Sequence, residues 1–261
     1  MKKYFLSLGL IVAAMFTLTN CTEQIDAPVE PAKVPFEIIA STAETKTTND
    51  GMSTEWSTDD AINLFHAING SQEYANDGMF SILEENLDIK KFTGTINGEL
   101  DSDATYDIYA FYPYTSYIST PANSNKGWVE VGSKSSEAQV QNGINSTTHI
   151  AGPYYPLAGV VKGVKISPQS PVQIDMSHVT ALLEFVVKND TKDPLTVTNI
   201  SFTATENVVG RYYIDFTDTE NLIFTSSDVN KVSAVAKLNV LDADPIPAGG
   251  SAKFYMAVKP F

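Results

Sequence analysis

Apolar and polar residues alternate along much of this 261-residue chain. A period of two places the two kinds of side chain on opposite faces of a β-strand. Residues 200–205 read Ile-Ser-Phe-Thr-Ala-Thr, and residues 179–187 and 232–240 show the same alternation. Because many half-buried strands need a second sheet to cover their apolar faces, the pattern predicts an all-β fold built from β-sandwiches.

One stretch departs from simple alternation. Residues 106–114, YDIYAFYPY, are apolar or aromatic on both faces, which predicts a strand covered on both sides. Turn-forming dipeptides separate the predicted strands, among them Asn69-Gly70, Asp77-Gly78 and Asn97-Gly98. Asn, Asp and Gly tolerate the positive φ that tight hairpins require, so these pairs predict turns.

The chain divides best at Ser167-Pro-Gln-Ser-Pro171, where two prolines and two serines interrupt the strand pattern. We therefore predict an N-terminal β-sandwich domain over 34–167 and a C-terminal one over 168–261. The C-terminal segment that stops at Phe261 reads as a strand. Either it closes a sheet or the sequence is cut short there, and both alternatives stay open.

Residues 1–20 read as an export signal. Two lysines precede a nearly uncharged run over 4–18, which is shorter than the roughly 20 apolar residues of a membrane-spanning helix. Leu18-Thr-Asn-Cys21 resembles the lipobox of bacterial lipoproteins, whose cysteine is acylated, for example with palmitate. Cys21 is then the lipid attachment site and 21–33 a tether. The alternative is an ordinary signal peptide with an incidental cysteine.

The charge of the chain limits its partners. Its formal net charge is −14, and the predicted signal carries two lysines and no acidic residue, so its removal makes the rest more acidic. A surface this acidic repels phosphate backbones, so we expect no nucleic-acid partner. Since Cys21 is the single cysteine, the exported chain depends on its hydrophobic core rather than on disulfides.

No catalytic motif emerges from the titratable residues. His66, His149 and His178 lie far apart in sequence, without the spacing of a zinc hydrolase, and there is no Gly-x-Ser-x-Gly motif. We expect these imidazoles to have structural roles. We also expect the protein to have no catalytic residue, metal, cofactor or enzymatic activity. Three acidic clusters read as solvated turns, with a weak calcium site as the alternative: Asp59-Asp60, Asp101-Ser-Asp103 and Asp242-Ala-Asp244.

Aromatic residues suggest a separate role in binding. The chain contains 12 Tyr, 13 Phe and 2 Trp, and aromatic rings stack on sugars. Tyr112 and Trp128 are the candidate glycan contacts. Tyrosine is also a favoured strand residue whose hydroxyl reaches the rim of a sandwich, so a structural role is the alternative.

Seven segments follow one another along the chain: the lipobox at Cys21, FEIIASTAETKTT (36–48), TEWSTDDAINLF (54–65), YDIYAFYPYTS (106–116), HVTALLEFVVKND (178–190), ISFTATENVVGRYYID (200–215) and IPAGGSAKFYMAVKP (246–260). In this order they resemble the fimbrillin-like (Mfa-like) family of Bacteroidetes surface lipoproteins, which includes the subunits of type V pili. The resemblance covers nearly the whole chain after the signal.

The resemblance implies two transthyretin-like β-sandwich domains in tandem and a fimbrial subunit or adhesin at the outer membrane. The implied partners are copies of itself, related pilins and a host or bacterial surface ligand. In polymerising members a protease cuts after an arginine near the first strand. The matching position here is Lys46, before Thr47, so lysine stands where arginine is expected.

The segment 34–41 shows how such a cut leads to assembly. Val34, Phe36, Ile38 and Ala40 form one apolar face, which suits a groove in a sheet. Removing this strand would expose unpaired backbone groups and an apolar trough, a template for a strand of another subunit. One alternative is that it stays as the first strand of a monomeric lipoprotein. A second is a non-polymerising, glycan-binding surface lipoprotein.

Overall fold

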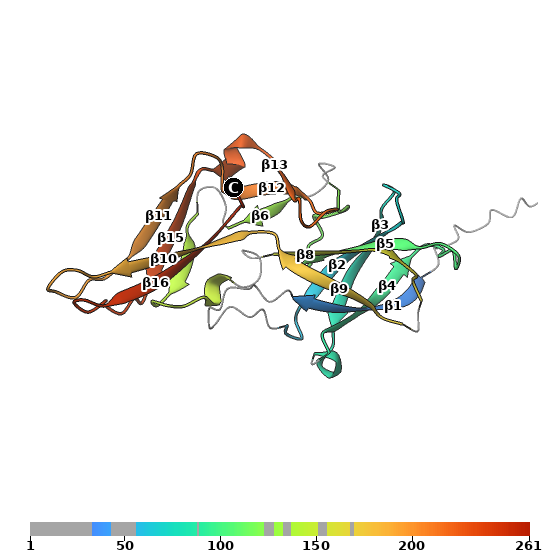
Figure 1. Cartoon of the computed structure of the whole chain (residues 1–261), viewed down its shortest axis with the longest axis horizontal. Helices are drawn as coiled ribbons and strands as arrows, with labels where there is room; N and C mark the ends of the chain where they lie inside the picture. The colour runs from blue at the N-terminus through green and yellow to red at the C-terminus, as the bar shows by residue number, and fades with distance from the viewer. Residues whose placement is uncertain are drawn as a thin grey trace, which may run out of the picture. The chain divides into compact units, whose positions relative to one another are not determined.

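The computed structural model describes residues 33–42, 56–87, 89–122, 128–132, 137–150, 156–167 and 170–261. These residues form β-strands, loops and a few short 3-10 turns, so the predicted all-β fold is confirmed (Figure 1). No helix in these ranges is long and apolar enough to cross a membrane. The transthyretin-like detail of the prediction stays a prediction.

The strands of the first half are β1 (Lys33–Thr42), β2 (Ala61–Ile68), β3 (Ala75–Ile82), β4 (Lys91–Asn97), β5 (Tyr106–Tyr112), β6 (Val129–Val131), β7 (Gln139–Asn142) and β8 (Leu157–Val164). Those of the second half are β9 (Val172–His178), β10 (Ala181–Lys188), β11 (Asn199–Thr203), β12 (Val209–Asp215), β13 (Ile223–Ser226), β14 (Val232–Ser233), β15 (Val235–Leu241) and β16 (Ser251–Val258). The 3-10 turns are η1 (Glu84–Asn86), η2 (Thr148–Ile150) and η4 (Val229–Lys231).

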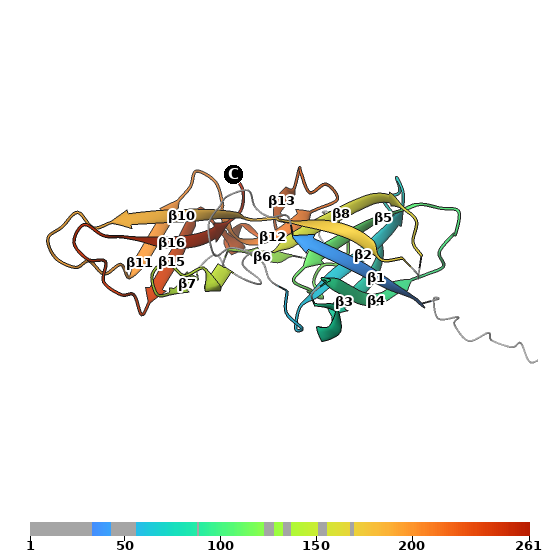
Figure 2. The same cartoon turned by 60° about the horizontal axis from the view of Figure 1, so that its bottom comes forward.

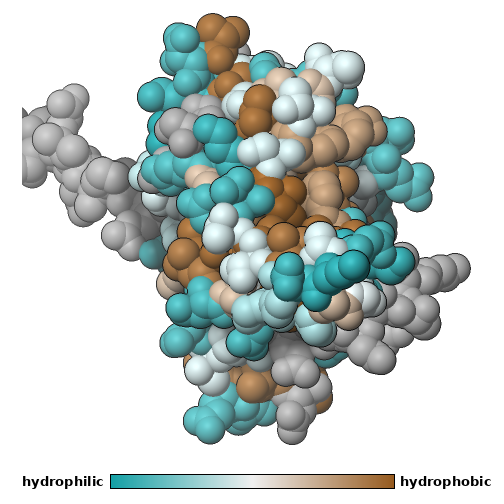
Figure 3. Space-filling model, turned by 90° about the vertical axis from the view of Figure 1, so that its left-hand side faces the viewer, coloured by the Kyte–Doolittle hydropathy of each residue, from teal (hydrophilic) through white to brown (hydrophobic). Residues whose placement is uncertain are grey.

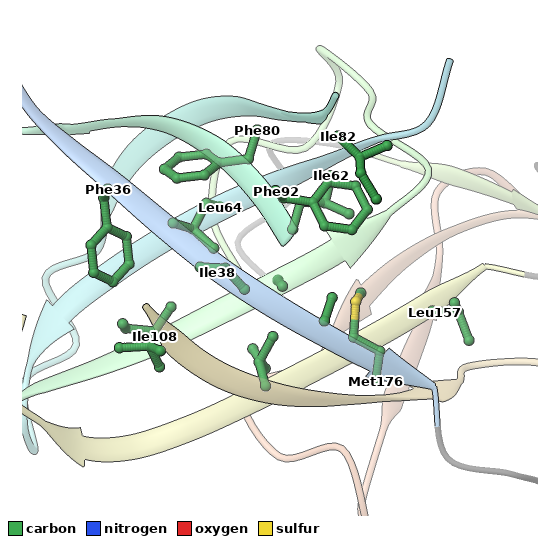
Figure 4. Close-up of a cluster of buried hydrophobic side chains, with 14 of the residues drawn as sticks. Phe36, Ile38, Ile62, Leu64, Phe80, Ile82, Phe92, Ile108, Leu157 and Met176 are labelled. Carbon is green, nitrogen blue, oxygen red and sulfur yellow. The ribbon is translucent and has the colours of Figure 1, made fainter. Parts of the chain in front are cut away.

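The first sheet closes into a barrel in the order β1-β4-β3-β2-β5-β8-β9. Its strands pair antiparallel, except that β1 and β9 run parallel where the barrel closes (Figures 1 and 2). The interior is filled by alternate residues of each strand. Phe36 and Ile38 of β1 project into the same interior as Leu64, Phe80 and Ile108 (Figure 4).

Strand β5 is covered on both faces, as its sequence predicts. Ile108 and Ala110 belong to the core inside the barrel. Tyr109 and Phe111 point the other way and join a second core with residues of β6, β12 and β14, and with Phe216. The double covering explains why the first six residues of β5 are all buried.

The remaining strands form three smaller sheets. Strands β10 and β16 make one, β11-β15-β7 make another, and β12 pairs with β13, β14 and β6. A third core lies between β10-β16 and β11-β15, with Leu238, Phe254 and Met256 fully buried. This part of the molecule is therefore a β-sandwich, in which two sheets pack face to face through the apolar sides of their strands.

Strand pairing does not follow the predicted division at 167/168. Strand β9 comes after it, yet pairs with β1 and β8 of the barrel. Strands β6 and β7 come before it, yet pair with β12 and β15. Alternation marks which face of a strand is apolar but not which strand lies beside it. The domain boundary itself stays a prediction.

One predicted turn is wrong. Asn69-Gly70 follows β2 and Asn97-Gly98 ends β4, as expected. Asp77-Gly78 instead lies inside β3, where Gly78 has φ +82° and the register with β2 shifts between Leu64 and Phe65. The positive φ is used for a β-bulge rather than for a hairpin.

Candidate functional site: the seat of strand β1

Strand β1 is paired along both of its edges. Residues 33–39 lie antiparallel to β4, and residues 38–42 lie parallel to β9. The pairings overlap only at Ile38 and Ile39, so the first half of β1 is held mainly by β4 and the second half by β9. We call the surface formed by β4, β9 and the barrel interior beneath β1 the β1 seat.

The inner face of β1 fills the β1 seat with apolar side chains. Phe36, Ile38 and Ala40 are buried to within 1% of full burial. The Phe36 and Phe80 rings meet edge to face, with centroids 6.4 Å apart. Gly94, opposite Phe36 on β4, makes room for Phe80, because a Cβ there would lie 2.6 Å from that ring. Full burial contributes roughly 1.5–3 kcal/mol for each large side chain.

Trp56 fixes the second half of β1 from outside the strand ladder. Its Nε1 donates a hydrogen bond of 3.2 Å to the Ala40 carbonyl. Its ring meets Phe92 and Tyr112 edge to face, each at a centroid distance of 5.0 Å. The Ala40 amide donates to the Lys90 carbonyl at 3.0 Å. No sequence pattern indicates this role for Trp56, since a lone tryptophan carries no signal of what it pairs with.

The outer face of β1 adds polar contacts to both neighbours. Lys91 Nζ of β4 lies 2.9 Å from Glu37 Oε1, and Ser41 Oγ of β1 donates to Asp175 of β9. Such half-exposed contacts orient the strand more than they stabilise it. Pro35 has no amide proton to donate to the ladder. The β1 seat thus combines two backbone ladders with a continuous apolar trough.

Three predicted site residues, Cys21, Lys46 and Thr47, lie outside the described residues. Lys46 follows the end of β1 at Thr42 by four positions in sequence. A cut between Lys46 and Thr47 would separate β1 from the strands that form its seat. The lipid attachment and processing roles stay predictions.

The two predicted glycan contacts have different surroundings. Tyr112 is half-buried at the end of β5, where its hydroxyl donates to Asp60 Oδ1 at 2.8 Å and its ring packs on Trp56. Burial, and then the bond to Asp60, raises the pKa of Tyr112 above its ordinary value. This geometry suits a packing role.

Trp128 instead belongs to a stack near the surface. Its ring stacks on Tyr117 with centroids 4.9 Å apart, and the Arg211 guanidinium lies 3.8 Å from its centroid. Arg211 Nε also donates to Glu130 at 3.1 Å. Tyr117 is 57% exposed, so its ring is accessible to a ligand. The structure therefore does not bring Tyr112 and Trp128 to one stack.

A buried polar pair lies elsewhere in the barrel. His66 Nδ1 is 2.8 Å from Asp77 Oδ2, and the Asn97 amide donates to Asp77 Oδ1 at 2.8 Å. Burial raises the pKa of Asp77, against the lowering effect of its partners. These bonds link β2, β3 and β4. Within the described ranges, no group of three or more His, Cys, Asp or Glu residues could hold a metal ion.

Comparison with known proteins identifies solved structures of similar fold. No protein-family model matches the chain, and no curated protein matches it. Among solved structures, a candidate cell adhesion protein from Bacteroides ovatus has a TM-score of 0.51 and 18% identity, over 88% of this chain and 79% of the other. A candidate cell adhesion protein from Bacteroides uniformis gives 0.51 and 17%, over 88% and 75%. At this identity the likeness shows that this chain shares their fold.

Proposed function

We propose that the chain is a surface adhesin or a structural fimbrial subunit, without enzymatic activity. It is exported as a lipoprotein, held at the outer membrane through Cys21, and has other pilins or a surface ligand as partners. What supports this is the fold shared with two candidate cell adhesion proteins of Bacteroides, together with the resemblance of the sequence to fimbrillin-like proteins.

We propose further that β1 is a removable strand. The observation that carries this is its position: β1 closes the barrel, has neighbours on both edges, and fills a trough with Phe36, Ile38 and Ala40. Its loss would leave the facing edges of β4 and β9 unpaired and the trough open. A strand of another subunit with apolar residues at alternate positions would pair with these edges and fill the trough. This mode of assembly is donor-strand complementation.

Controlled proteolysis tests this proposal. Brief treatment of the purified protein with trypsin should give a new N-terminus at Thr47 and a ladder of oligomers in size-exclusion chromatography with light scattering. Lys46→Gln should prevent both. Lys33→Gln is the matched control, because a cut after Lys33 leaves β1 attached to the rest of the chain. Cleavage at Lys46 that yields only monomers would exclude assembly and leave a static lipoprotein.

Glycan binding is the second candidate function, and the stack of Tyr117, Trp128 and Arg211 favours it. An exposed ring beside a guanidinium offers a sugar both a stacking face and hydrogen-bond donors. Trp128→Ala should abolish retention on immobilised polysaccharide, whereas Tyr112→Phe should not affect it. Retention that is unchanged in Trp128→Ala would remove this candidate.

A further inference from the structure

The C-terminal sandwich has two open sides, or flanks, along its strands, and the strand edges on the two flanks have different surroundings. At one flank the last strands are β10 in one sheet and β11 in the other. Phe185 of β10 and Phe202 of β11 face each other across the gap, with ring centroids 6.4 Å apart. We call this side of the sandwich the β10–β11 flank.

Burial falls sharply towards the β10–β11 flank. On β16, the inward residues Phe254, Met256 and Val258 are fully buried. Leu183 and Phe185 point into the same core from β10, yet are only half-buried. The same holds for Val187 of β10 and for Ile200 and Phe202 of β11. Figure 3, which views the molecule from the end that carries the C-terminal sandwich, shows hydrophobic residues exposed between hydrophilic ones. The apolar core is therefore partly exposed along the β10–β11 flank.

The opposite edge of the β10-β16 sheet is closed by side-chain amides. Gln139 of β7 bonds twice to Ala257 of β16, donating to its carbonyl at 2.8 Å and accepting from its amide at 2.9 Å. Gln141 accepts from the Tyr255 amide at 2.9 Å. Asn145 continues the row along β16 by accepting from its next outward amide at 2.8 Å. No further strand can add at that edge while this amide ladder is in place.

The amide ladder also reveals which backbone groups of β10 point outward. The odd-numbered residues of β16 bond to the ladder, so its even-numbered residues bond to β10. The register pairs Met256 with Leu183 and Phe254 with Phe185, so the odd-numbered residues of β10 bond to β16. The N–H and C=O groups of Glu184 and Val186 therefore point away from β16, as do those of Leu182 and Lys188. Among the described residues, β10 has no strand partner on this side.

Few of the features that normally protect an edge strand are present on β10. It contains no proline, and its register with β16 is unbroken over eight residues. Its two charged side chains already have partners, Glu184 with Lys253 at 3.1 Å and Lys188 with Asp190 at 2.7 Å. Val186 is 59% exposed and uncharged.

An aromatic ring of this chain already contacts one part of this exposed core. The Phe261 ring stacks on Phe202 with centroids 5.9 Å apart, while remaining 66% exposed. Phe202 therefore accepts an apolar side chain from the open side. The Phe261 contact does not pair with the backbone edge of β10, which has no strand partner there among the described residues.

We propose that β10 is a second strand-accepting site, distinct from the β1 seat, whose occupant is an extended segment of another polypeptide with apolar residues at alternate positions. The row of outward backbone groups requires a strand, because only a strand presents matching donors and acceptors at the same repeat. The half-buried apolar side chains along the flank call for an apolar residue at every second position of that strand. The site does not depend on removal of β1.

A labelled peptide tests this site on the uncleaved protein. The probe is a synthetic peptide of alternating valine and threonine with lysines at its ends, and the control peptide has the same composition with its valines contiguous. Fluorescence anisotropy should show saturable binding of the alternating peptide and at least about tenfold weaker binding of the control peptide. Absence of saturable binding would overturn the proposal.

A proline at the edge gives the sharper comparison. Val186→Pro removes one outward N–H without touching the pairing with β16, so we expect an unchanged melting temperature and at least about tenfold weaker peptide binding. Val186→Thr keeps the N–H and should bind as the wild type does. Equal binding by Val186→Pro, or loss of binding only in Ser201→Pro on β11, would overturn the assignment to β10.

Sedimentation separates the proposed occupant from a second copy. The wild-type protein should be monomeric before cleavage at every concentration used in the anisotropy experiment. A dimer that Val186→Pro converts to monomer would overturn the partner assignment and make the flank a contact between copies. Because no protease is added, failure here leaves the proposed role of β1 unaffected.

Discussion

At the scale of single residues, His149 is a half-buried titratable group whose two ring nitrogens have different surroundings. Its Nε2 lies 3.0 Å from the Tyr255 carbonyl, to which a neutral imidazole can donate. Its Nδ1 is buried and has no hydrogen-bond partner among the described residues. Protonation would place a second N–H at that buried position. Burial therefore lowers the pKa of His149 below the ordinary 6.5, and the bond to Tyr255 only partly offsets this.

The lowered pKa predicts acid sensitivity. Below pH 6.5 the unfolded chain binds a proton at this position more readily than the folded protein, so stability falls as the pH drops from 6.5 towards the folded pKa. Well above pH 6.5 the imidazole is neutral in both states, so it adds no pH dependence to the unfolding free energy. Between pH 7.5 and 5, His149→Gln should therefore lose less unfolding free energy than the wild type in urea titrations. An equal loss in both proteins would assign the acid sensitivity to other groups.

At the scale of elements, the amide ladder on β16 replaces a strand with side chains. Gln139 and Gln141 are fully buried, and their amides bond to backbone groups that a neighbouring strand would normally satisfy. A buried donor or acceptor without a partner costs about 1–3 kcal/mol. The ladder therefore stabilises the edge of β16 mainly by avoiding that cost.

Removing one rung tests the ladder. Gln139→Ala leaves the amide and carbonyl of Ala257 without partners, and should lower the unfolding free energy by about 2–5 kcal/mol. Val140→Ala is the matched control on the same strand, since Val140 is partly exposed and should cost less than about 1 kcal/mol. Chemical denaturation measures both. Similar values for the two variants would show that the ladder contributes little.

The elements also show how far sequence reasoning reaches. Alternation predicted the apolar face of β1, and the two apolar faces of residues 106–114 predicted a strand covered on both sides. Both depend on local residue order. The parallel pairing of β1 with β9 and the bonds of Gln139 to β16 join residues more than 100 positions apart. No local pattern encodes such pairs, and glutamine reads as a solvated residue until its partner is known.

At the scale of the whole molecule, the described strands share a core across the predicted domain boundary. Phe216 is fully buried, and its ring lies 6.2 Å from Phe65 and 5.2 Å from Phe111, measured between centroids. Phe65 and Phe111 lie on the outer face of the barrel, whereas Phe216 follows β12. Tyr212 and Val131 join the same core from β12 and β6. The barrel and the C-terminal strands are therefore coupled by direct packing.

This shared core predicts cooperative unfolding. The two tryptophans report on different parts, Trp56 on the barrel core and Trp128 on the strands around β12. Trp56→Phe and Trp128→Phe, each in an otherwise wild-type chain, leave one tryptophan as the fluorescent reporter. For each variant, the urea unfolding transition seen by fluorescence should coincide with the one seen by circular dichroism. Phe216→Ala creates a cavity in the shared core, at a cost of about 3–5 kcal/mol.

In the Phe216→Ala background, the transitions seen by the two tryptophans should separate, because the packing that links the barrel to the C-terminal strands is lost. Phe254→Ala is the matched control, since Phe254 is equally buried but lies in the core of the C-terminal sandwich. It should cost a similar free energy without uncoupling the barrel from the strands around β12. If Phe216→Ala shifts both transitions together, the parts are coupled by other contacts and the shared core is not what makes them fold as one.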